Sequence, residues 1–111
     1  MPKPNPSPAE VWVIDLGLAA KVRPCVILTK LPADDELDLV TVVLHTGSLR
    51  GNRWELRIPE PFLKEGAFHL QQVHSAPVPR LMRKLGELSR AEFGLVLERL
   101  AERLGIHAGK D

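Results

Sequence analysis

The sequence predicts a mainly β protein: a small, mostly antiparallel barrel with one α-helix packed on it. Three observations indicate this fold class. Several short apolar runs are separated by turn residues, one segment alternates between apolar and charged residues, and one stretch near the end has helical periodicity. At 111 residues, the chain is long enough for one hydrophobic core, and we expect a single domain without internal repeats.

The composition is that of a water-soluble globular protein, with 44% apolar and 26% charged residues. No apolar run approaches the roughly 18 residues of a membrane span, and the N-terminus lacks the apolar region of a secretory signal. We therefore expect a cytoplasmic protein without membrane contact. Cys25 is the only cysteine, so an internal disulfide is excluded, and its apolar neighbours predict a packed thiol rather than a nucleophile.

The two ends of the chain are expected to lie outside the fold. Residues 1–8 contain four prolines among polar residues, which predicts a disordered or extended leader. The domain then covers residues 9–107, and residues 108–111 form a short tail.

Five segments have the apolar runs or the alternation expected of strands. Val22–Leu28 reads as a strand with a charged entrance: Pro24 stands at its first position, and Arg23 lies just outside. In residues 75–80, Pro77 and Pro79 exclude regular structure before the short segment Leu81–Leu88. The five segments are Glu10–Leu16, Val22–Leu28, Leu39–Leu44, Trp54–Ile58 and Ala67–Val73.

The C-terminal helix has clear start and stop signals. Ser89 and Glu92 have the spacing of a capping box, and Gly105 supplies the C-terminal stop. Its predicted apolar face consists of Phe93, Val96, Leu97, Leu100 and Leu104.

Arg23 and the loop from His45 to Arg53 are the first candidates for a functional site. A guanidinium presents a planar fork of donors suited to phosphate or carboxylate and does not titrate near neutral pH. Thr46 and Ser48 add hydroxyls, and Arg50 and Arg53 add positive charge. Taken singly, Arg23 fits a strand-end cation paired with an acid, and the loop fits a solvated hairpin tip.

His74 and a basic cluster are further candidates. His74 follows a strand and can act as an acid or base near neutral pH, although a histidine at a strand end more often has a structural role. The cluster Arg80, Arg83 and Lys84 fits a nucleic-acid contact and a solvated face equally well. No Cys or His cluster has the spacing of metal ligands, so we expect no metal.

Several segments together resemble the PemK/MazF-like toxins of bacterial toxin–antitoxin modules. They are Glu10–Leu16, Val22–Leu28 with its arginine and proline, Val42–Thr46, Leu70–Val73, and Leu85–Ser89 before the terminal helix. Their order and spacing carry the resemblance, which spans nearly the whole chain after the leader. Two departures concern substrate choice: a short connection at Gly17–Val22, and His74 where many members have an arginine.

The resemblance implies an SH3-like barrel that forms a homodimer and acts as an mRNA interferase. Such an enzyme is a sequence-selective, metal-independent endoribonuclease that cuts single-stranded RNA by attack of the ribose 2′-hydroxyl on the adjacent phosphate, without a cofactor. Arg23 and Thr46 match the catalytic residues of the family. Ser48, Arg50, Arg53 and His74 are then expected to contact RNA, and a cognate antitoxin protein is the expected partner.

Two other functions are compatible with the same barrel. One is a CcdB-like toxin that acts on DNA gyrase, in which residues 106–111 after the helix would matter. The other is a catalytically silent module that binds RNA with salt-dependent affinity and releases no fragments.

Overall fold

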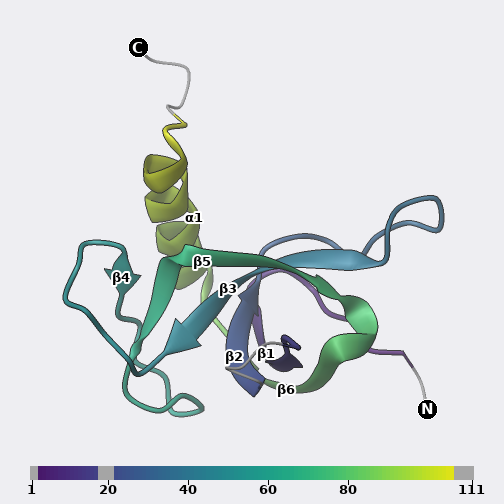
Figure 1. The fold of residues 1–111 in the computed structure, drawn as a ribbon, viewed down its shortest axis with the longest axis horizontal. Coiled ribbons are helices and arrows are strands. Elements are labelled where there is room, and N and C mark those ends of the chain that lie inside the picture. Colours follow the sequence, from purple (N-terminus) through teal and green to yellow (C-terminus); the bar gives the residue numbers. More distant parts are fainter. Residues whose placement is uncertain (1–2, 18–21, 107–111) are drawn as a thin grey trace.

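The computed structural model describes residues 3–17 and 22–106. Six strands, one short 3₁₀ helix and one α-helix follow each other along the chain (Figure 1). The elements are β1 Glu10–Asp15, β2 Val22–Ile27, β3 Leu39–Thr46, β4 Glu55–Leu56, β5 Ala67–Pro77, η1 Val78–Arg80, β6 Leu81–Glu87 and α1 Arg90–Leu104.

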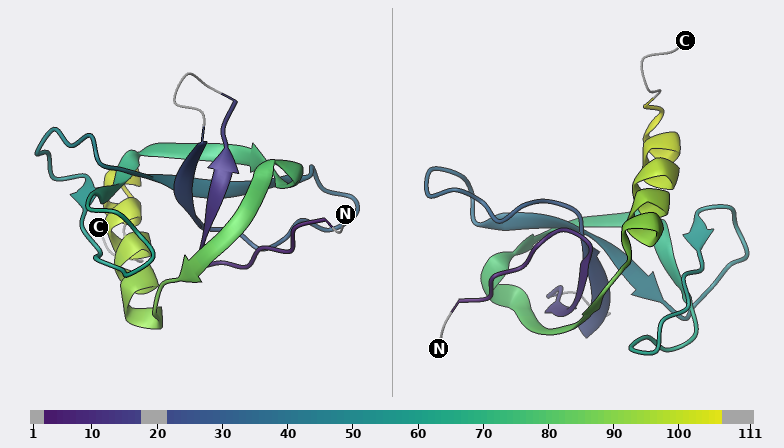
Figure 2. Two further views of the ribbon diagram at one scale, coloured as in Figure 1. Left: turned by 90° about the horizontal axis from the view of Figure 1, so that it is seen from below. Right: turned by 180° about the vertical axis from the view of Figure 1, so that it is seen from behind.

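The six strands form one curved sheet in the order β4-β5-β3-β2-β1-β6, and every recorded pairing is antiparallel. The sheet curls around an interior, with β4 and β6 as its edges, and α1 stands beside β5 (Figures 1 and 2). The predicted fold class, mainly β with a C-terminal helix, is confirmed. The sheet is barrel-like without being closed.

Apolar side chains fill two cores, because both faces of the central strands are buried. Ile14, Cys25 and Val42 belong to the core inside the curl of the sheet. Val26 and Phe68 belong to the second core, to which the helix contributes Val96 and Leu100. The central strands therefore read as nearly continuous apolar runs.

The segment around residues 75–80 is more regular than predicted. β5 continues through Pro77, and η1 then leads directly into β6. Pro77 is the last residue of β5, and Pro79 lies near the start of η1. At both positions the missing N–H does not interrupt the hydrogen bonds of a strand or helix. The prediction of irregular structure here was wrong.

The predicted strand Trp54–Ile58 is much shorter than its alternation suggested. Only Glu55 and Leu56 pair with β5, opposite His69 and Phe68. Leu56 and Ile58 are nevertheless buried. The alternation of apolar and charged residues therefore reflects which side chains are buried rather than which residues pair with β5.

The N-terminal segment differs from the expected leader. Pro6 is fully buried, the N–H of Ala9 donates to the carbonyl oxygen of Ile27 at 2.9 Å, and Lys3 pairs with Asp38 at 2.8 Å. Residues 3–8 therefore pack against the fold. Residues 18–21 of the short connection and the predicted tail 108–111 lie outside the described residues.

Helix α1 confirms the predicted caps. Ser89 and Glu92 form both bonds of the capping box, and Gly105 ends the helix with a left-handed φ of 75°. Val96 and Leu100 of the predicted apolar face are buried, whereas Leu97 and Leu104 are exposed. No helix within the described ranges is long and apolar enough to cross a membrane.

Candidate functional site

A cavity of about 430 Å³ opens where β2 and β3 separate. Arg23 and Thr46 both line it, together with residues of β1 and β6 and the segment before β5. The lining residues are Val13, Val22, Arg23, Pro24, His45, Thr46, Gly47, Phe62, Leu63, Lys64, Glu65, Arg83 and Leu85.

The register of the sheet explains why Arg23 and Thr46 meet. β2 pairs with β3 from Cys25 opposite Leu44 onward, and the same register continued by two residues places Arg23 level with Thr46. Pro24 has no N–H to donate to this ladder. The pairing of β2 with β3 therefore ends at Cys25, and the residues beyond this pair line the cavity.

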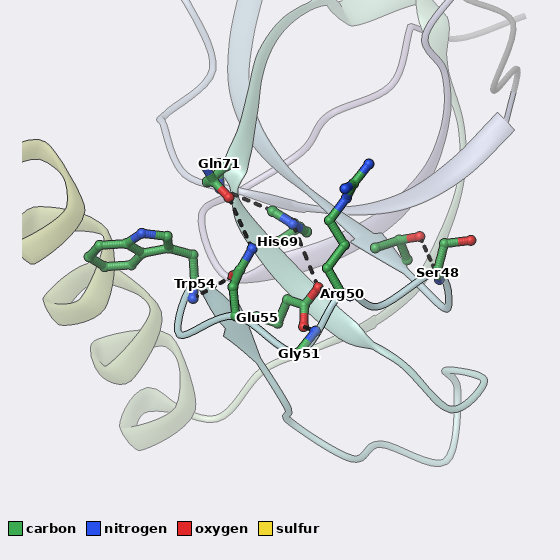
Figure 3. Close-up of polar contacts among 9 residues, drawn as sticks. Ser48, Arg50, Gly51, Trp54, Glu55, His69 and Gln71 are labelled. Carbon is green, nitrogen blue, oxygen red and sulfur yellow. Dashed lines mark hydrogen bonds and ion pairs between the residues drawn. The ribbon is translucent and has the colours of Figure 1, made fainter.

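Thr46 is held by its backbone and by one hydrogen bond. Its side chain accepts a bond from the N–H of Ser48 at 3.0 Å (Figure 3), and the residue is only 9% exposed. Because this bond occupies a lone pair of Oγ1, the hydroxyl proton remains available to a ligand in the cavity.

Close packing at a glycine fixes the position of Thr46. A Cβ atom at Gly66 would overlap the carbonyl oxygen of Thr46 and lie 2.9 Å from its carbonyl carbon. The absence of a side chain at Gly66 therefore allows the start of β5 to approach the end of β3. Gly86 plays the same role for Phe62, because its Cβ would lie 2.6 Å from the Phe62 ring.

His45 forms part of the cavity wall as a neutral imidazole. Its ring packs edge-on against Phe68, with 4.9 Å between ring centroids, and only 5% of the residue is exposed. Burial lowers the pKa of His45 from 6.5, since the charged form loses its hydration.

The basic cluster of the sequence divides into two groups. Arg80 lies 3.7 Å from Asp15, and Lys84 lies 3.2 Å from Glu10. These two cations are thus engaged in ion pairs, whereas Arg83 lines the cavity with Arg23. Lys64 and Glu65, which had no distinguishing sequence pattern, also reach the cavity.

The loop after β3 is folded around a carboxylate rather than around the cavity. Glu55 accepts hydrogen bonds from the N–H groups of Arg50 at 2.6 Å and Gly51 at 2.7 Å (Figure 3). These backbone bonds lower the pKa of Glu55, and His69 Nε2 lies 3.8 Å away. The N–H of Gln71 donates to His69 Nδ1 at 3.3 Å, which leaves the imidazole proton on the nitrogen that faces Glu55.

Arg50 and Arg53 lie outside the cavity lining. The guanidinium of Arg53 covers the ring of Trp54 at 4.4 Å, and Arg99 Nη2 donates to the Arg53 carbonyl oxygen at 2.6 Å. Trp54 is therefore partly covered by cations from the loop and from α1.

His74 is not brought to the cavity of Arg23. It lies on β5 opposite Val42 and lines a separate cavity with Asp15 and Arg80. Its Nε2 atom is buried without a hydrogen-bond partner in the described part of the chain. Of the six predicted site residues, the structure brings Arg23 and Thr46 together, with Ser48 bonded to Thr46.

Two further features bear on the chemistry. Burial raises the pKa of Cys25 to about 12, so the residue is a packed thiol, as predicted. Within residues 3–17 and 22–106, no three His, Cys, Asp or Glu residues are grouped so that they could hold a metal ion.

The fold and the cavity define a class of small, mainly β proteins in which basic residues line a cavity at the ends of two central strands. A family model described as PemK-like, MazF-like toxin of type II toxin–antitoxin system matches residues 7–104. The chain therefore belongs to the PemK/MazF-like toxin family. A search among curated proteins returned no match.

Three solved structures with this fold are similar over nearly their whole length. MazE–MazF from Deinococcus radiodurans has a TM-score of 0.77 at 17% identity, over 94% of this chain and 99% of that chain. An endoribonuclease from a mycobacterial species has a TM-score of 0.76 at 19% identity, over 96% and 97%. A mycobacterial endoribonuclease in complex with its cognate antitoxin has a TM-score of 0.73 at 22% identity, over 93% and 98%.

Proposed function

We propose that this protein is a toxin that cuts single-stranded RNA, including mRNA, at short sequences, as an endoribonuclease without metal or cofactor. The observation that carries the proposal is the shared cavity of Arg23 and Thr46. The two residues lie on the successive strands β2 and β3, and the register of these strands places them level with each other. The endoribonucleases among the structural neighbours support it.

The reaction is attack of a ribose 2′-oxygen on the adjacent phosphorus. The bond from phosphorus to the 5′-oxygen breaks, which leaves a 2′,3′-cyclic phosphate and a 5′-hydroxyl. The 2′-hydroxyl loses one proton, and the departing 5′-oxygen gains one. Negative charge grows on the phosphoryl oxygens during the step, so fixed donors around the phosphate lower the barrier.

Arg23 and Thr46 supply such donors. The guanidinium of Arg23 keeps its charge at all working pH values and matches two phosphate oxygens with its planar fork. Thr46 is immobilised by Ser48, and its free hydroxyl proton can point at a third oxygen. Loss of one such donor typically lowers the rate about 100-fold, or about 3 kcal/mol of transition-state stabilisation.

The remaining contacts concern the RNA strand outside the cavity. Ser48 adjoins Thr46, and Arg50 and Arg53 stand on the following loop, so we assign these three to flanking nucleotides. His74 lines a different cavity, so its proposed contact concerns nucleotides farther along the strand.

Cleavage of a mixed-sequence RNA in buffer with a chelator tests the proposal. We expect fragments that end in cyclic phosphate, and at least a 100-fold loss of rate in Arg23→Ala and in Thr46→Ala. Lys30→Ala is the matched control, because Lys30 is an exposed cation outside the cavity lining. Absence of cleavage by the wild type, or equal rates for wild type and Arg23→Ala, would refute the proposal.

A cognate antitoxin and a second copy of the chain are the proposed partners. A small neighbouring reading frame with an acidic, disordered tail is the expected antitoxin, since such a tail can fold into a basic groove and displace RNA. Adding this protein to the cleavage reaction is expected to stop it, and light scattering of the toxin alone is expected to give the mass of a dimer.

A further inference from the structure

The cavity of Arg23 and Thr46 holds more positive charge than one phosphate needs. Arg23, Lys64 and Arg83 line it, and Glu65 is the acid among the described lining residues. His45 adds no charge near neutral pH because burial lowers its pKa. Since the whole chain has a net charge of only +1, positive charge is concentrated at this cavity.

The three cations of the cavity face no carboxylate partner among the described residues, although Arg23 Nη1 donates a hydrogen bond to the carbonyl oxygen of Val22 at 3.0 Å. Within the described ranges, none of them forms an ion pair, whereas the neighbouring Arg80 and Lys84 are paired with Asp15 and Glu10. Unpaired cations in a concave site are an arrangement suited to anions, because they require no competing carboxylate to be displaced.

Arg23 and Arg83 enter the cavity from different strands. Arg83 on β6 stands opposite Val13 on β1, and Val13 stands opposite Pro24 on β2. Two strand spacings therefore separate the backbones of β6 and β2, roughly 10 Å. The cavity volume of about 430 Å³ is in the range of sites that hold a ligand larger than one phosphate.

We infer that Arg83, assisted by Lys64, binds the RNA phosphate next to the one that Arg23 and Thr46 contact. The cavity is thus a site for two consecutive phosphates of a single strand. This inference rests on the proposed function for the identity of the ligand. Arg83 and Lys64 are binding residues in this arrangement, so their loss affects affinity more than the chemical step.

The experiment compares Arg83→Gln with Lys84→Gln, which removes an equal charge one residue along the same strand. Lys84 is the matched control because it is ion-paired and does not line the cavity. Binding is measured over a series of salt concentrations with an oligonucleotide that contains deoxyribose throughout, so that cleavage cannot occur. Cleavage of the RNA form is measured in parallel.

We expect Arg83→Gln to weaken binding about tenfold and to reduce the slope of log affinity against log salt by about 0.7, the value for one phosphate of a single strand. Lys64→Gln is expected to act in the same direction. kcat is expected to stay within about threefold of the wild type, while KM rises. Lys84→Gln is expected to keep the wild-type slope.

A second measurement locates the phosphate. Once the wild-type cleavage site is mapped, a neutral methylphosphonate is placed at the linkage next to it. The change is expected to weaken binding by the wild type and to leave Arg83→Gln unaffected, because the partner charge is already absent.

The possible outcomes separate the inference from the proposed function. An unchanged salt slope in both Arg83→Gln and Lys64→Gln, with wild-type cleavage intact, would overturn the inference alone. Binding that depends on Arg83, without RNA cleavage by the wild type, would support the phosphate site and refute the endoribonuclease.

Discussion

Replacement of Gly66 by alanine tests whether the position of Thr46 controls activity. The added Cβ would overlap the Thr46 carbonyl oxygen and lie 2.9 Å from its carbonyl carbon, where real Cβ atoms keep at least 3.0 Å. Both of these neighbours are backbone atoms, which cannot move aside as a flexible side chain can, and Cε1 of the buried His45 ring lies 3.0 Å from the added Cβ. Ordinary van der Waals separation requires a displacement on the order of 1 Å between β5 and the end of β3.

The expected effect is larger on activity than on stability. Overpacking of this kind costs about 1–3 kcal/mol of folding free energy, which a stable domain can tolerate. A displacement on the order of 1 Å in a group that contacts the reacting phosphate lowers the rate about 100-fold. Gly66→Ala should therefore remain folded and lose about two orders of magnitude in kcat.

The assay combines denaturant unfolding with single-turnover cleavage of RNA. Gly47→Ala is the matched control at the cavity, because its Cβ would lie 3.4 Å from the Glu65 carbonyl oxygen, at the limit of ordinary contact. A Gly66→Ala protein that is folded and cleaves within about threefold of the wild type would refute the idea that this contact positions Thr46.

Three further predictions concern stability and reactivity. Gly94→Ala should raise the free energy of unfolding by about 1 kcal/mol in a denaturant titration, because Gly94 lies inside α1 with open space around its Cβ; an unchanged midpoint would contradict this. The pKa of His45 is lowered from 6.5 in the folded state, so the unfolded state binds its proton first, and stability should fall as the pH drops below 6.5. His45→Gln should flatten this part of the pH profile in thermal unfolding, and an equally steep profile would exclude His45 as its source. Burial raises the pKa of Cys25 to about 12, against 9.0 when exposed, so at pH 8 it should react with a thiol reagent roughly a thousandfold more slowly than free cysteine. Rapid labelling of the folded protein would contradict this and show that the core around Cys25 opens.

Features encoded by neighbouring residues could be predicted from the sequence. The capping box of Ser89 and Glu92 and the stop at Gly105 depend on contacts within one helical turn, and the structure contains all of them. Exposure of Leu97 and Leu104 could not be predicted, because helical periodicity defines a face but not the width of the sheet that covers it.

Features that depend on distant parts of the chain escaped the sequence patterns. The alternation at Trp54–Ile58 predicted a strand of five residues, but pairing with β5 stops after Leu56. The Glu55 carboxylate instead accepts hydrogen bonds from the N–H groups of Arg50 and Gly51 in the preceding loop. Lys64 reaches the cavity because residues of the segment before β5 line it. No local pattern marks such a residue.

Arg83 illustrates the same limit within a single cluster. The sequence placed Arg80, Arg83 and Lys84 together as equivalent basic residues. Their different roles follow from partners elsewhere, since Asp15 and Glu10 on β1 engage two of them and leave the third at the cavity. The alternation of β6 shows that Arg83 and Leu85 share one face of the strand. Only the register with β1 shows that this face lies toward the cavity.

The location of the site follows from one residue in the middle of the sheet. Pro24 lies in β2, a central strand, where the missing N–H would leave the ladder to β3 incomplete. The pairing with β3 ends one residue later along the chain, at Cys25. This early end leaves Arg23 and Thr46 unpaired with each other, while Arg23 stays opposite Ile14 of β1 and Thr46 stays opposite Ala67 of β5. The cavity is thereby lined by a cation and a hydroxyl from neighbouring strands, and the proposed function assigns to them the stabilisation of developing charge on a phosphate.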